Sequence, residues 1–193
     1  MITGQIDSDQ ADYIESVIHQ PKEIEWVLEK VTSGYYEDCP GVLFHEDSGE
    51  SPQLVKPVFP GKTGPRWSED WIWPLLCQPI VSHAGFKVED FMSAKINMIL
   101  PQHSHASSFK WHTPHIDTSE KHKVLLYYVN DSEAPTYFFK ERFDGTVKDT
   151  CTFDDLAYAK KGSYVIFDGD TFHASSPPVD EYRSVINFNF HAD

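Results

Sequence analysis

YRSVINFNF, residues 182–190, is one of five β-prone segments in the second half of the chain. Val, Ile and aromatic residues favour a strand, and the side chains of a strand point alternately to its two faces. We expect one face of this strand to meet an apolar core covered by helices, and the other face to line the mouth of a barrel. The apolar face carries Tyr182, Ile186, Phe188 and Phe190, and the polar face carries Arg183, Asn187 and Asn189.

The other four β-prone segments follow one another without intervening helices. This order is typical of an antiparallel sandwich or barrel, whereas a parallel sheet alternates its strands with helices. Asp144-Gly145 predicts a hairpin turn between two strands. The sequence therefore predicts a mainly β fold from about residue 86 onward. The four segments are FMSAKINMIL (91–100), KVLLYYVN (123–130), TYFF (136–139) and SYVIF (163–167).

The first 85 residues differ, and we expect helices there that pack on one face of the sheet. Apolar residues recur at the helical period, and polar residues that cap helices precede them. Stretches rich in Gly, Pro and Ser predict loops. The expected elements are a helix capped by Asp7 or Ser8 and ending near Ile18, a helix from Pro21 carrying Ile24, Trp26, Val27 and Leu28, a loop over residues 47–66, and a helix from Ser68 that Pro74 breaks or kinks.

The composition is that of a single packed domain over residues 1–193, with 1–85 as helical and loop support and 86–193 as the core. The formal net charge of −14 disfavours a nucleic-acid partner, which needs a cationic surface. No apolar run reaches the roughly 18 residues of a membrane span, and the N-terminus lacks the pattern of a signal peptide. We expect a cytoplasmic protein whose three cysteines (Cys39, Cys77 and Cys151) are free thiols.

One pattern points to a metal site. His115-Ile-Asp117 is followed 56 residues later by His173 and ten residues after that by Arg183. Two imidazoles and one carboxylate are the ligands of mononuclear non-haem iron(II) sites, and side chains two apart on a strand share a face. The H-x-D pattern also occurs at residues 45–47 and 191–193, but only the middle copy precedes a strand-rich segment with a distal His.

The stretch from Asn97 to Phe190, about half of the chain, resembles the iron(II)- and 2-oxoglutarate-dependent oxygenases, particularly their prolyl-hydroxylase-like branch. Two departures stand out. Ala134-Pro135-Thr136 stands where many relatives have paired glycines before a Thr, and Arg183 stands where the collagen-type prolyl hydroxylases have Lys. The segments that carry the resemblance are WHTPHID (111–117), LLYYVNDSEAPTYFF (125–139), KKGSYVIFDGDTFHASSP (160–177) and YRSVINFNF (182–190).

The resemblance implies a double-stranded β-helix, the jelly-roll or cupin-like fold, with the N-terminal helices packed on one sheet. It implies that His115, Asp117 and His173 bind Fe²⁺. Arg183 would then bind the distal carboxylate of the co-substrate 2-oxoglutarate. In that branch a Tyr-x-Asn, matched here by residues 128–130, contacts the co-substrate, which implies a role for Tyr128. Asn97, in the first barrel strand, would add a polar contact.

The implied activity is hydroxylation of an unidentified substrate, either a protein side chain such as proline or a small metabolite, with release of succinate and carbon dioxide. Two alternatives remain open on the sequence. One is a metal-binding jelly-roll module without turnover, which would not need Arg183. The other is a nucleobase oxygenase, which the acidic composition disfavours.

The residues around the first two ligands are expected to select the substrate, because loops on a rigid barrel often carry specificity. Several of these residues have a second interpretation. Trp111 is equally a candidate core residue, and the histidines could form a zinc cluster with His115. Arg183 could instead pair with Asp168 or Asp170. The tryptophans Trp67, Trp71 and Trp73 fit either a core or a lid, and the expected substrate-facing residues are Trp111, His112, His103 and His105.

Overall fold

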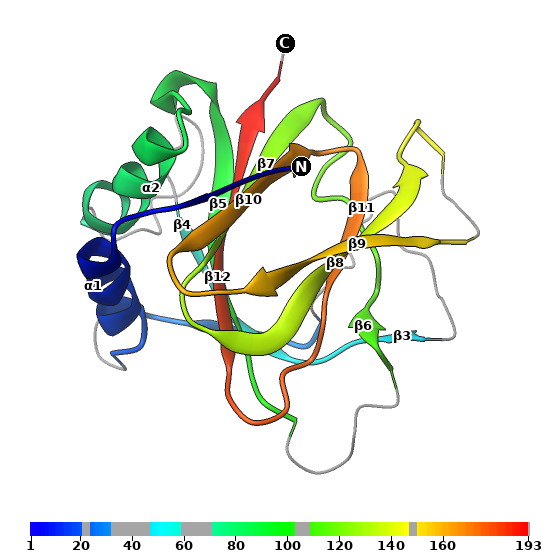
Figure 1. Cartoon of the computed structure of the whole chain (residues 1–193), viewed down its shortest axis with the longest axis horizontal. Helices are drawn as coiled ribbons and strands as arrows, with labels where there is room; N and C mark the ends of the chain where they lie inside the picture. Colours follow the sequence, from blue (N-terminus) through cyan, green and yellow to red (C-terminus); the bar gives the residue numbers. More distant parts are fainter. Residues whose placement is uncertain (21–23, 32–46, 59–70, 103–108, 147–149, 193) are drawn as a thin grey trace.

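The computed structural model describes residues 1–20, 24–31, 47–58, 71–102, 109–146 and 150–192. Within these ranges two β-sheets face each other (Figure 1). The large sheet has the order β1-β10-β7-β12-β5-β4-β2, and a smaller sheet has the order β11-β8-β9. The strands are β1 (Ile2–Gln5), β2 (Val27–Glu29), β3 (Ser48–Gly49), β4 (Gln53–Val58), β5 (Phe91–Ile99), β6 (Trp111–His112), β7 (His122–Tyr128), β8 (Ser132–Arg142), β9 (Phe153–Ala159), β10 (Ser163–Asp168), β11 (Thr171–Ser175) and β12 (Arg183–His191).

Strand β12 lies at the centre of the large sheet, antiparallel to both β5 and β7. Its two faces differ as the sequence predicts. Ile186, Phe188 and Phe190 belong to the core between the sheet and the helices, while Val185 belongs to the core between the two sheets. Tyr182 lies just before β12 and is 36% exposed, so it sits at the edge of the helix-covered core and not within it.

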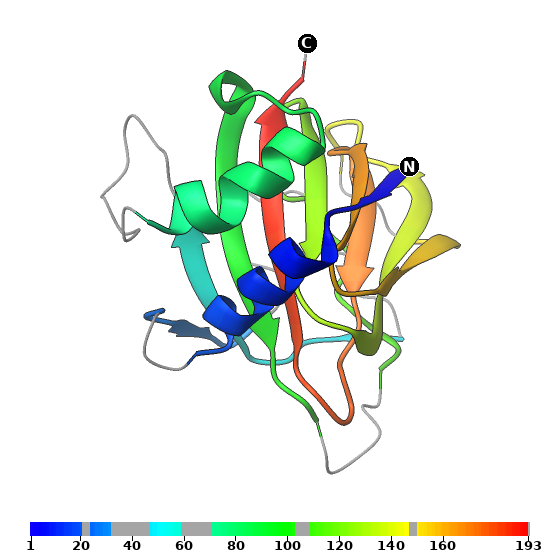
Figure 2. The ribbon, with the colours of Figure 1, turned by 60° about the vertical axis from the view of Figure 1, so that its left-hand side comes forward.

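The helices cover the outer face of the large sheet (Figure 2). Helix α1 (Ser8–Ile18) is capped by Asp7, whose carboxylate accepts a hydrogen bond from Asp9 N at 2.9 Å, and it buries Ala11, Ile14 and Ile18. A π-helical turn (Trp73–Cys77) leads into α2 (Gln78–His83), and a 3-10 turn (Val88–Asp90) precedes β5. These helices bury the apolar face of β12, as an amphipathic helix must.

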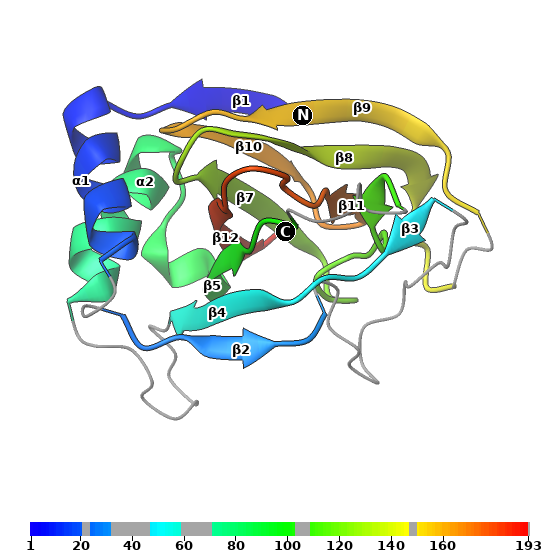
Figure 3. The same cartoon turned by 90° about the horizontal axis from the view of Figure 1, so that it is seen from below.

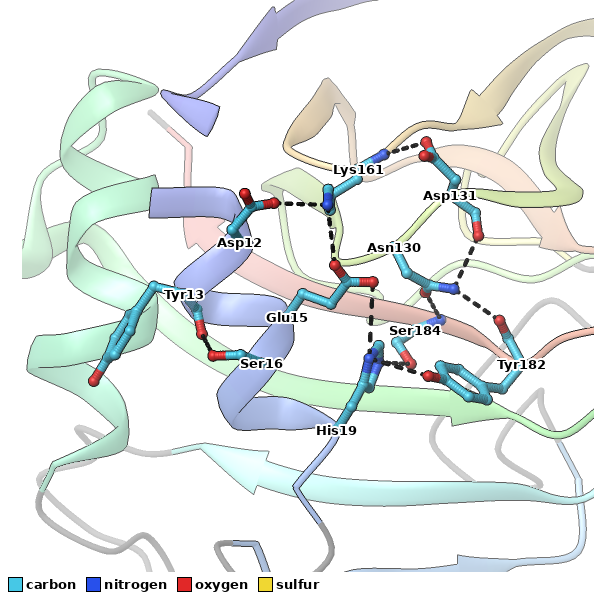
Figure 4. Close-up of polar contacts among 10 residues, drawn as sticks. All are labelled: Asp12, Tyr13, Glu15, Ser16, His19, Asn130, Asp131, Lys161, Tyr182 and Ser184. Carbon is cyan, nitrogen blue, oxygen red and sulfur yellow. Dashed lines mark hydrogen bonds and ion pairs between the residues drawn. The ribbon is translucent and has the colours of Figure 1, made fainter. Parts of the chain in front are cut away.

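Polar contacts fasten α1 to the strands beneath it (Figure 4). Lys161 Nζ lies 2.7 Å from Asp12 Oδ1 and 3.1 Å from Glu15 Oε2. At the end of the helix, His19 Nε2 is 3.1 Å from Ser184 Oγ on β12 and His19 Nδ1 is 3.3 Å from the Tyr182 hydroxyl. The helix is thus tied to the residue that follows Arg183.

Asn130 holds the chain where it enters β12. Its Nδ2 donates to the carbonyl oxygens of Asp131 and Tyr182, both at 2.9 Å. Its Oδ1 accepts from the backbone N–H of Ser184 at 2.8 Å (Figure 4). The Asn of the Tyr-x-Asn pattern therefore fixes the backbone on either side of Arg183.

The segment that follows β6 approaches the small sheet at a backbone bridge between His115 and His173, which lies in β11. Each residue donates its N–H to the carbonyl oxygen of the other, both at 3.0 Å. Between the sheets, Tyr128, Phe138 and Phe167 are buried together. Seen from below, the helices lie on one side of the large sheet and β8, β9 and β11 on the other (Figure 3). The fold is the expected mainly β jelly roll, with the helices on one sheet.

Some expectations for the N-terminal part were wrong. Residues 24–31 form no helix, and Val27–Glu29 is strand β2, paired with β4. Val27 and Leu28 are 56% and 64% exposed, so they lack the buried face that would stabilise a helix, and pairing at the sheet edge decides their structure. The expected loop 47–66 contains β3 and β4 as far as residue 58, and the rest lies outside the described residues.

The third expected helix is present in part. Its predicted start at Ser68 lies outside the described residues, and the helical run covers residues 73–83. Pro74 occupies the first turn, where a missing N–H does no harm, so it does not break the helix. Strands β8 and β9 form the expected hairpin, but residues 143–152 connect them and the turn is longer than predicted. Gly145 adopts φ +93° there.

The remaining expectations for the scaffold concern tryptophans, thiols and the membrane. Trp71 and Trp73 pack against the helix-covered core, which favours the core interpretation, and Trp67 lies outside the described ranges. Cys77 and Cys151 are free and buried, and Cys39 is likewise not described. Of the helices that the structure describes, none is long and apolar enough to cross a membrane.

We expect Asn130→Ala to lower the free energy of unfolding by about 1–3 kcal/mol, because it leaves the buried N–H of Ser184 without a partner. Urea denaturation followed by circular dichroism measures this loss. Lys160→Ala, an exposed change nearby, should stay within about 0.5 kcal/mol of wild type. Equal stabilities of the two variants would show that Asn130 does not hold this junction.

Candidate metal centre

The three predicted metal ligands meet at one point. His115 and Asp117 follow β6, and His173 lies in β11. One nitrogen from each imidazole and one carboxylate oxygen all lie within 4.8 Å of one another. His173 is 5% exposed, and the other two residues are partly buried. The backbone bridge between the two histidines sets this spacing.

Both histidines are held in the tautomer that a metal ligand needs. Nδ1 of His115 lies 3.0 Å from Thr113 O, and Nδ1 of His173 lies 3.1 Å from Thr171 O. A carbonyl oxygen only accepts, so each Nδ1 carries the proton and each Nε2 keeps its lone pair for a metal. The Nδ1 of His122 makes a similar bond to Glu120 O. A bond from Nδ1 to a backbone carbonyl therefore does not by itself identify a metal ligand, and the nearby carboxylate of Asp117 is needed as well.

Asp117 is held as an anion. Asn187 Nδ2 donates to its two carboxylate oxygens at 3.2 and 3.1 Å. Burial alone would raise the pKa of Asp117, but the charges of His173, Lys95 and His115 and the Asn187 bond outweigh it and lower the pKa to about 2.

His173 stays neutral at physiological pH, because burial first, and then the charge of His115, lower its pKa to about 4. A metal site needs deprotonated ligands, and His173 and Asp117 meet this requirement before a metal binds. Two neutral nitrogens and one carboxylate oxygen fit a ferrous ion.

Arg183 is buried without a counter-charge. It is 2% exposed, its Nε donates to Ala134 O at 2.9 Å, and its Nη2 donates to Thr136 Oγ1 at 2.6 Å. Its guanidinium lies over the Tyr128 ring, 5.6 Å from the centroid. Within the ranges that the structure describes, no carboxylate forms an ion pair with it. A buried cation of this kind needs an anionic partner.

The alternative partners for Arg183 are engaged elsewhere. Asp168 pairs with Lys123, and Asp170 pairs with Arg142 Nη1 at 2.7 Å. The suggested ion pair between Arg183 and either aspartate is therefore not formed.

A narrow cavity of about 40 Å³ joins the metal ligands to Arg183. His115, His173, Thr136, Arg183 and Asn97 are among the residues that line it, and we call it the Arg183 cavity. Its volume holds only a water or two, at roughly 30 Å³ each, so side chains must move apart to admit a dicarboxylate.

The other two predicted co-substrate residues differ in position. Asn97 lines the Arg183 cavity, and its buried Oδ1 has no hydrogen-bond partner among the described residues. Tyr128 is fully buried and does not line the cavity. Its hydroxyl donates to Thr136 Oγ1 at 2.9 Å. Tyr128 thus contacts Thr136 and Arg183 from the side away from the cavity.

Two of the expected substrate-facing residues lie in the interior. Trp111 is 5% exposed and packs with Tyr137 and Phe139, with ring centroids 5.3 and 5.4 Å apart, so its position favours the core interpretation. His112 is fully buried, with Nε2 next to Ser51 Oγ and Nδ1 2.8 Å from Ser175 Oγ.

These contacts bear on the rival zinc cluster. Burial lowers the pKa of His112 to about 3, and serine hydroxyls occupy both of its ring nitrogens. His112 is therefore not available as a ligand in this conformation. His103 and His105 lie outside the described residues.

Three residues of the site were not predicted for the roles they have. Thr136 bonds Arg183, and Asn187 bonds Asp117, although the sequence only placed Asn187 on the barrel face. Lys95 lines the Arg183 cavity from β5, and no role was foreseen for it. Strand alternation predicts that Lys95 and Asn97 share a face, but their position opposite the metal ligands depends on the strand register.

Neither a protein-family model nor a curated protein sequence matches the chain. Solved structures do. The non-heme alpha ketoglutarate dependent epimerase SnoN from nogalamycin biosynthesis aligns with a TM-score of 0.63 and 11% identity over 99% of this chain and 78% of its own. A Pseudomonas putida prolyl-4-hydroxylase aligns with a TM-score of 0.52 and 11% identity over 99% and 92%. This chain has their fold.

Two further structures extend the comparison. AviO1 from Streptomyces viridochromogenes Tue57 aligns with a TM-score of 0.59 and 12% identity over 98% of this chain and 89% of its own. SnoN has also been solved in complex with Fe³⁺, alpha ketoglutarate and nogalamycin RO. The resemblance suggested by the motifs is thus confirmed at the level of the fold, and the role of each residue rests on its geometry.

We expect Asn187→Ala to weaken Fe²⁺ binding by roughly 10–100-fold, because hydrogen bonds to a ligating carboxylate orient it and hold it ionised. Anaerobic titration of the metal-free protein gives the affinity. Asn130→Ala, which removes another buried asparagine away from the ligands, should destabilise the protein and leave the affinity within about twofold. An unchanged affinity in Asn187→Ala would separate Asn187 from the metal centre.

Proposed function

We propose that this chain is an iron(II)- and 2-oxoglutarate-dependent dioxygenase that hydroxylates its substrate. The observation that carries the proposal is the buried Arg183, which shares a cavity with two of the metal-binding residues and has no counter-charge among the described residues. A dicarboxylate that binds the metal at one end and Arg183 at the other satisfies both. The likeness in fold to 2-oxoglutarate-dependent enzymes supports this choice.

His115 and His173 would hold the iron through Nε2, and Asp117 through its carboxylate. When bound, iron supplies the redox chemistry by which dioxygen oxidises 2-oxoglutarate to succinate and carbon dioxide and adds one oxygen atom to the substrate. Two neutral nitrogens and one anion leave a ferrous site with a net positive charge, which attracts the dianionic co-substrate. The backbone bridge keeps the two histidines in place.

Arg183 would bind and orient the distal carboxylate of 2-oxoglutarate. Its Nε and Nη2 are already fixed by Ala134 O and Thr136 Oγ1, so the guanidinium is held rigid before the ligand arrives. A rigid guanidinium loses little entropy on binding and forms charge-assisted hydrogen bonds with a carboxylate. The apolar walls of the cavity, Ile99, Leu126 and Val185, keep water away from this pair.

A metal-binding module without turnover would have no use for this arrangement. Such a module needs the three ligands, but burying an unpaired guanidinium beside them costs free energy that only an anionic ligand recovers. Arg183 therefore favours the oxygenase over the binding module.

We expect Arg183→Leu to weaken 2-oxoglutarate binding by roughly 30-fold or more, since losing one partner of a buried charge pair costs about 2–5 kcal/mol. Anaerobic calorimetry with Fe²⁺ present measures the affinity. Arg142→Leu, which removes an exposed arginine paired with Asp170, should bind 2-oxoglutarate as wild type does. If Arg183→Leu also bound it as wild type does, the proposed orientation of the co-substrate would be wrong.

Asp117→Ala should abolish succinate production while the protein stays folded, because it removes a metal ligand and no core volume. Production of succinate from 2-oxoglutarate is measured together with the circular dichroism spectrum. Asp168→Ala, which removes an exposed carboxylate paired with Lys123, is the matched control and should retain full turnover. Succinate production by Asp117→Ala at the wild-type rate would refute the ligand set.

A further inference from the structure

A second cavity lies beside the Arg183 cavity, further along β5 and β12. The register places Arg183 opposite Ile99, Asn187 opposite Lys95 and Asn189 opposite Ser93. The second cavity, of about 250 Å³, covers the part of this surface from Lys95 to Asn189 and reaches Asp117. We call it the Asn189 cavity. Lys95 and Asn187 line both cavities, and each cavity also contains metal-binding residues, His115 and His173 in the Arg183 cavity and Asp117 in the Asn189 cavity.

The wall of the Asn189 cavity contains Lys95, whose charge acts on Asp117 but which forms no ion pair with it. Lys95 is partly exposed and makes no hydrogen bond or ion pair with any residue in the described ranges. Asp117 lies near it, but Asn187 and the bound metal would already satisfy that carboxylate. The ammonium of Lys95 is therefore free to bind an anionic group in the cavity.

Two side chains that line the same cavity carry buried acceptors. Asn187 and Asn189 are 5% and 8% exposed, and the Oδ1 atom of each has no donor among the described residues. The orientation of Asn187 is set by Asp117, because a carboxylate accepts only and must face Nδ2. Asn189 Nδ2 lies 3.3 Å from Ser93 Oγ, which directs its Oδ1 away from Ser93. Unpaired buried acceptors call for a ligand that donates hydrogen bonds.

Glu29, on β2, adds a carboxylate to the wall of this cavity, and Val55 and Pro57 add apolar surface between the charges. Gln53 Nε2 donates to Glu29 Oε2 at 3.2 Å, which holds this side chain in place. The cavity thus combines one cation, two carboxylates, of which Asp117 would bind the metal, and two hydrogen-bond acceptors around an apolar floor.

We propose that the Asn189 cavity binds the primary substrate and that this substrate is a small zwitterion, a free amino acid or a close derivative. This inference rests on the proposed function. Lys95 binds the carboxylate of the substrate, and Glu29 and the Asn189 amide oxygen accept from its ammonium group. A peptide segment presents neutral amides at these positions and would leave Lys95 and Glu29 without a counter-charge from the ligand. Asp117 in the wall brings the bound molecule next to the metal.

The test uses the whole protein with Mn²⁺, 2-oxoglutarate and no oxygen, titrated with each of the proteinogenic L-amino acids. We expect at least one to raise the melting temperature, since a ligand of the folded state stabilises it. With Fe²⁺ and oxygen, the same amino acid should stimulate succinate production and gain one oxygen atom. Its methyl ester and its N-acetyl derivative, which each lack one charge, should bind about tenfold more weakly or worse.

Variants assign the contacts. Asn189→Leu should weaken binding of the amino acid by about tenfold and affect 2-oxoglutarate binding much less, and Lys95→Met should also weaken binding of the amino acid by about tenfold. Lys123→Met, an exposed lysine on the neighbouring strand β7 that pairs with Asp168, should bind both as wild type does. If 2-oxoglutarate binds and no amino acid does, or if a proline-containing peptide binds instead, the inference is overturned and the proposed function stands. If 2-oxoglutarate does not bind, both the proposed function and this inference are refuted.

Discussion

Strand β12 is buried on both faces, and the rest of the structure depends on this. Every residue from Arg183 to Phe190 is buried, because helices cover one face and the small sheet faces the other. A strand in this position can carry polar side chains on its inner face only if each finds a partner there. Some partners are within the protein, such as Asp117 for Asn187. Others, for Arg183 and Asn189, must come from ligands. The chemistry proposed for this protein follows from these polar side chains, whose hydrogen-bond and charge partners are incomplete within the protein.

The alternating segments and the His-Asp-His spacing could be predicted from the sequence because they depend on local rules. The side chains of β12 divide between its faces as the two-residue period requires, and His115 and Asp117 need only one short stretch of chain to come together. The N-terminal strands could not be predicted in the same way. Val27 and Leu28 have no buried face of their own, and only pairing with β4 makes β2 a strand.

Side-chain roles were harder to predict where they depend on contacts across the barrel. His112 lies three residues before a metal-binding residue and looked like part of the site, yet two serines distant in sequence surround it. Tyr128 was expected to touch the co-substrate but is buried behind Arg183. Lys95 gave no signal at all, because a lysine in a strand is more often exposed. In each case the strand register decided the outcome.

The fastening of α1 also protects the site. A shift of β12 by one residue against its neighbours would exchange its two faces and turn Arg183 toward the helices, with Ser184 in its place inside the barrel. Asn130 and His19 both grip Ser184, one through the backbone and one through the hydroxyl (Figure 4). Only one register of β12 allows both hydrogen bonds to Ser184 to form. The outer helix therefore opposes a shift in the register of β12, and it stabilises the position of Arg183 without contacting it.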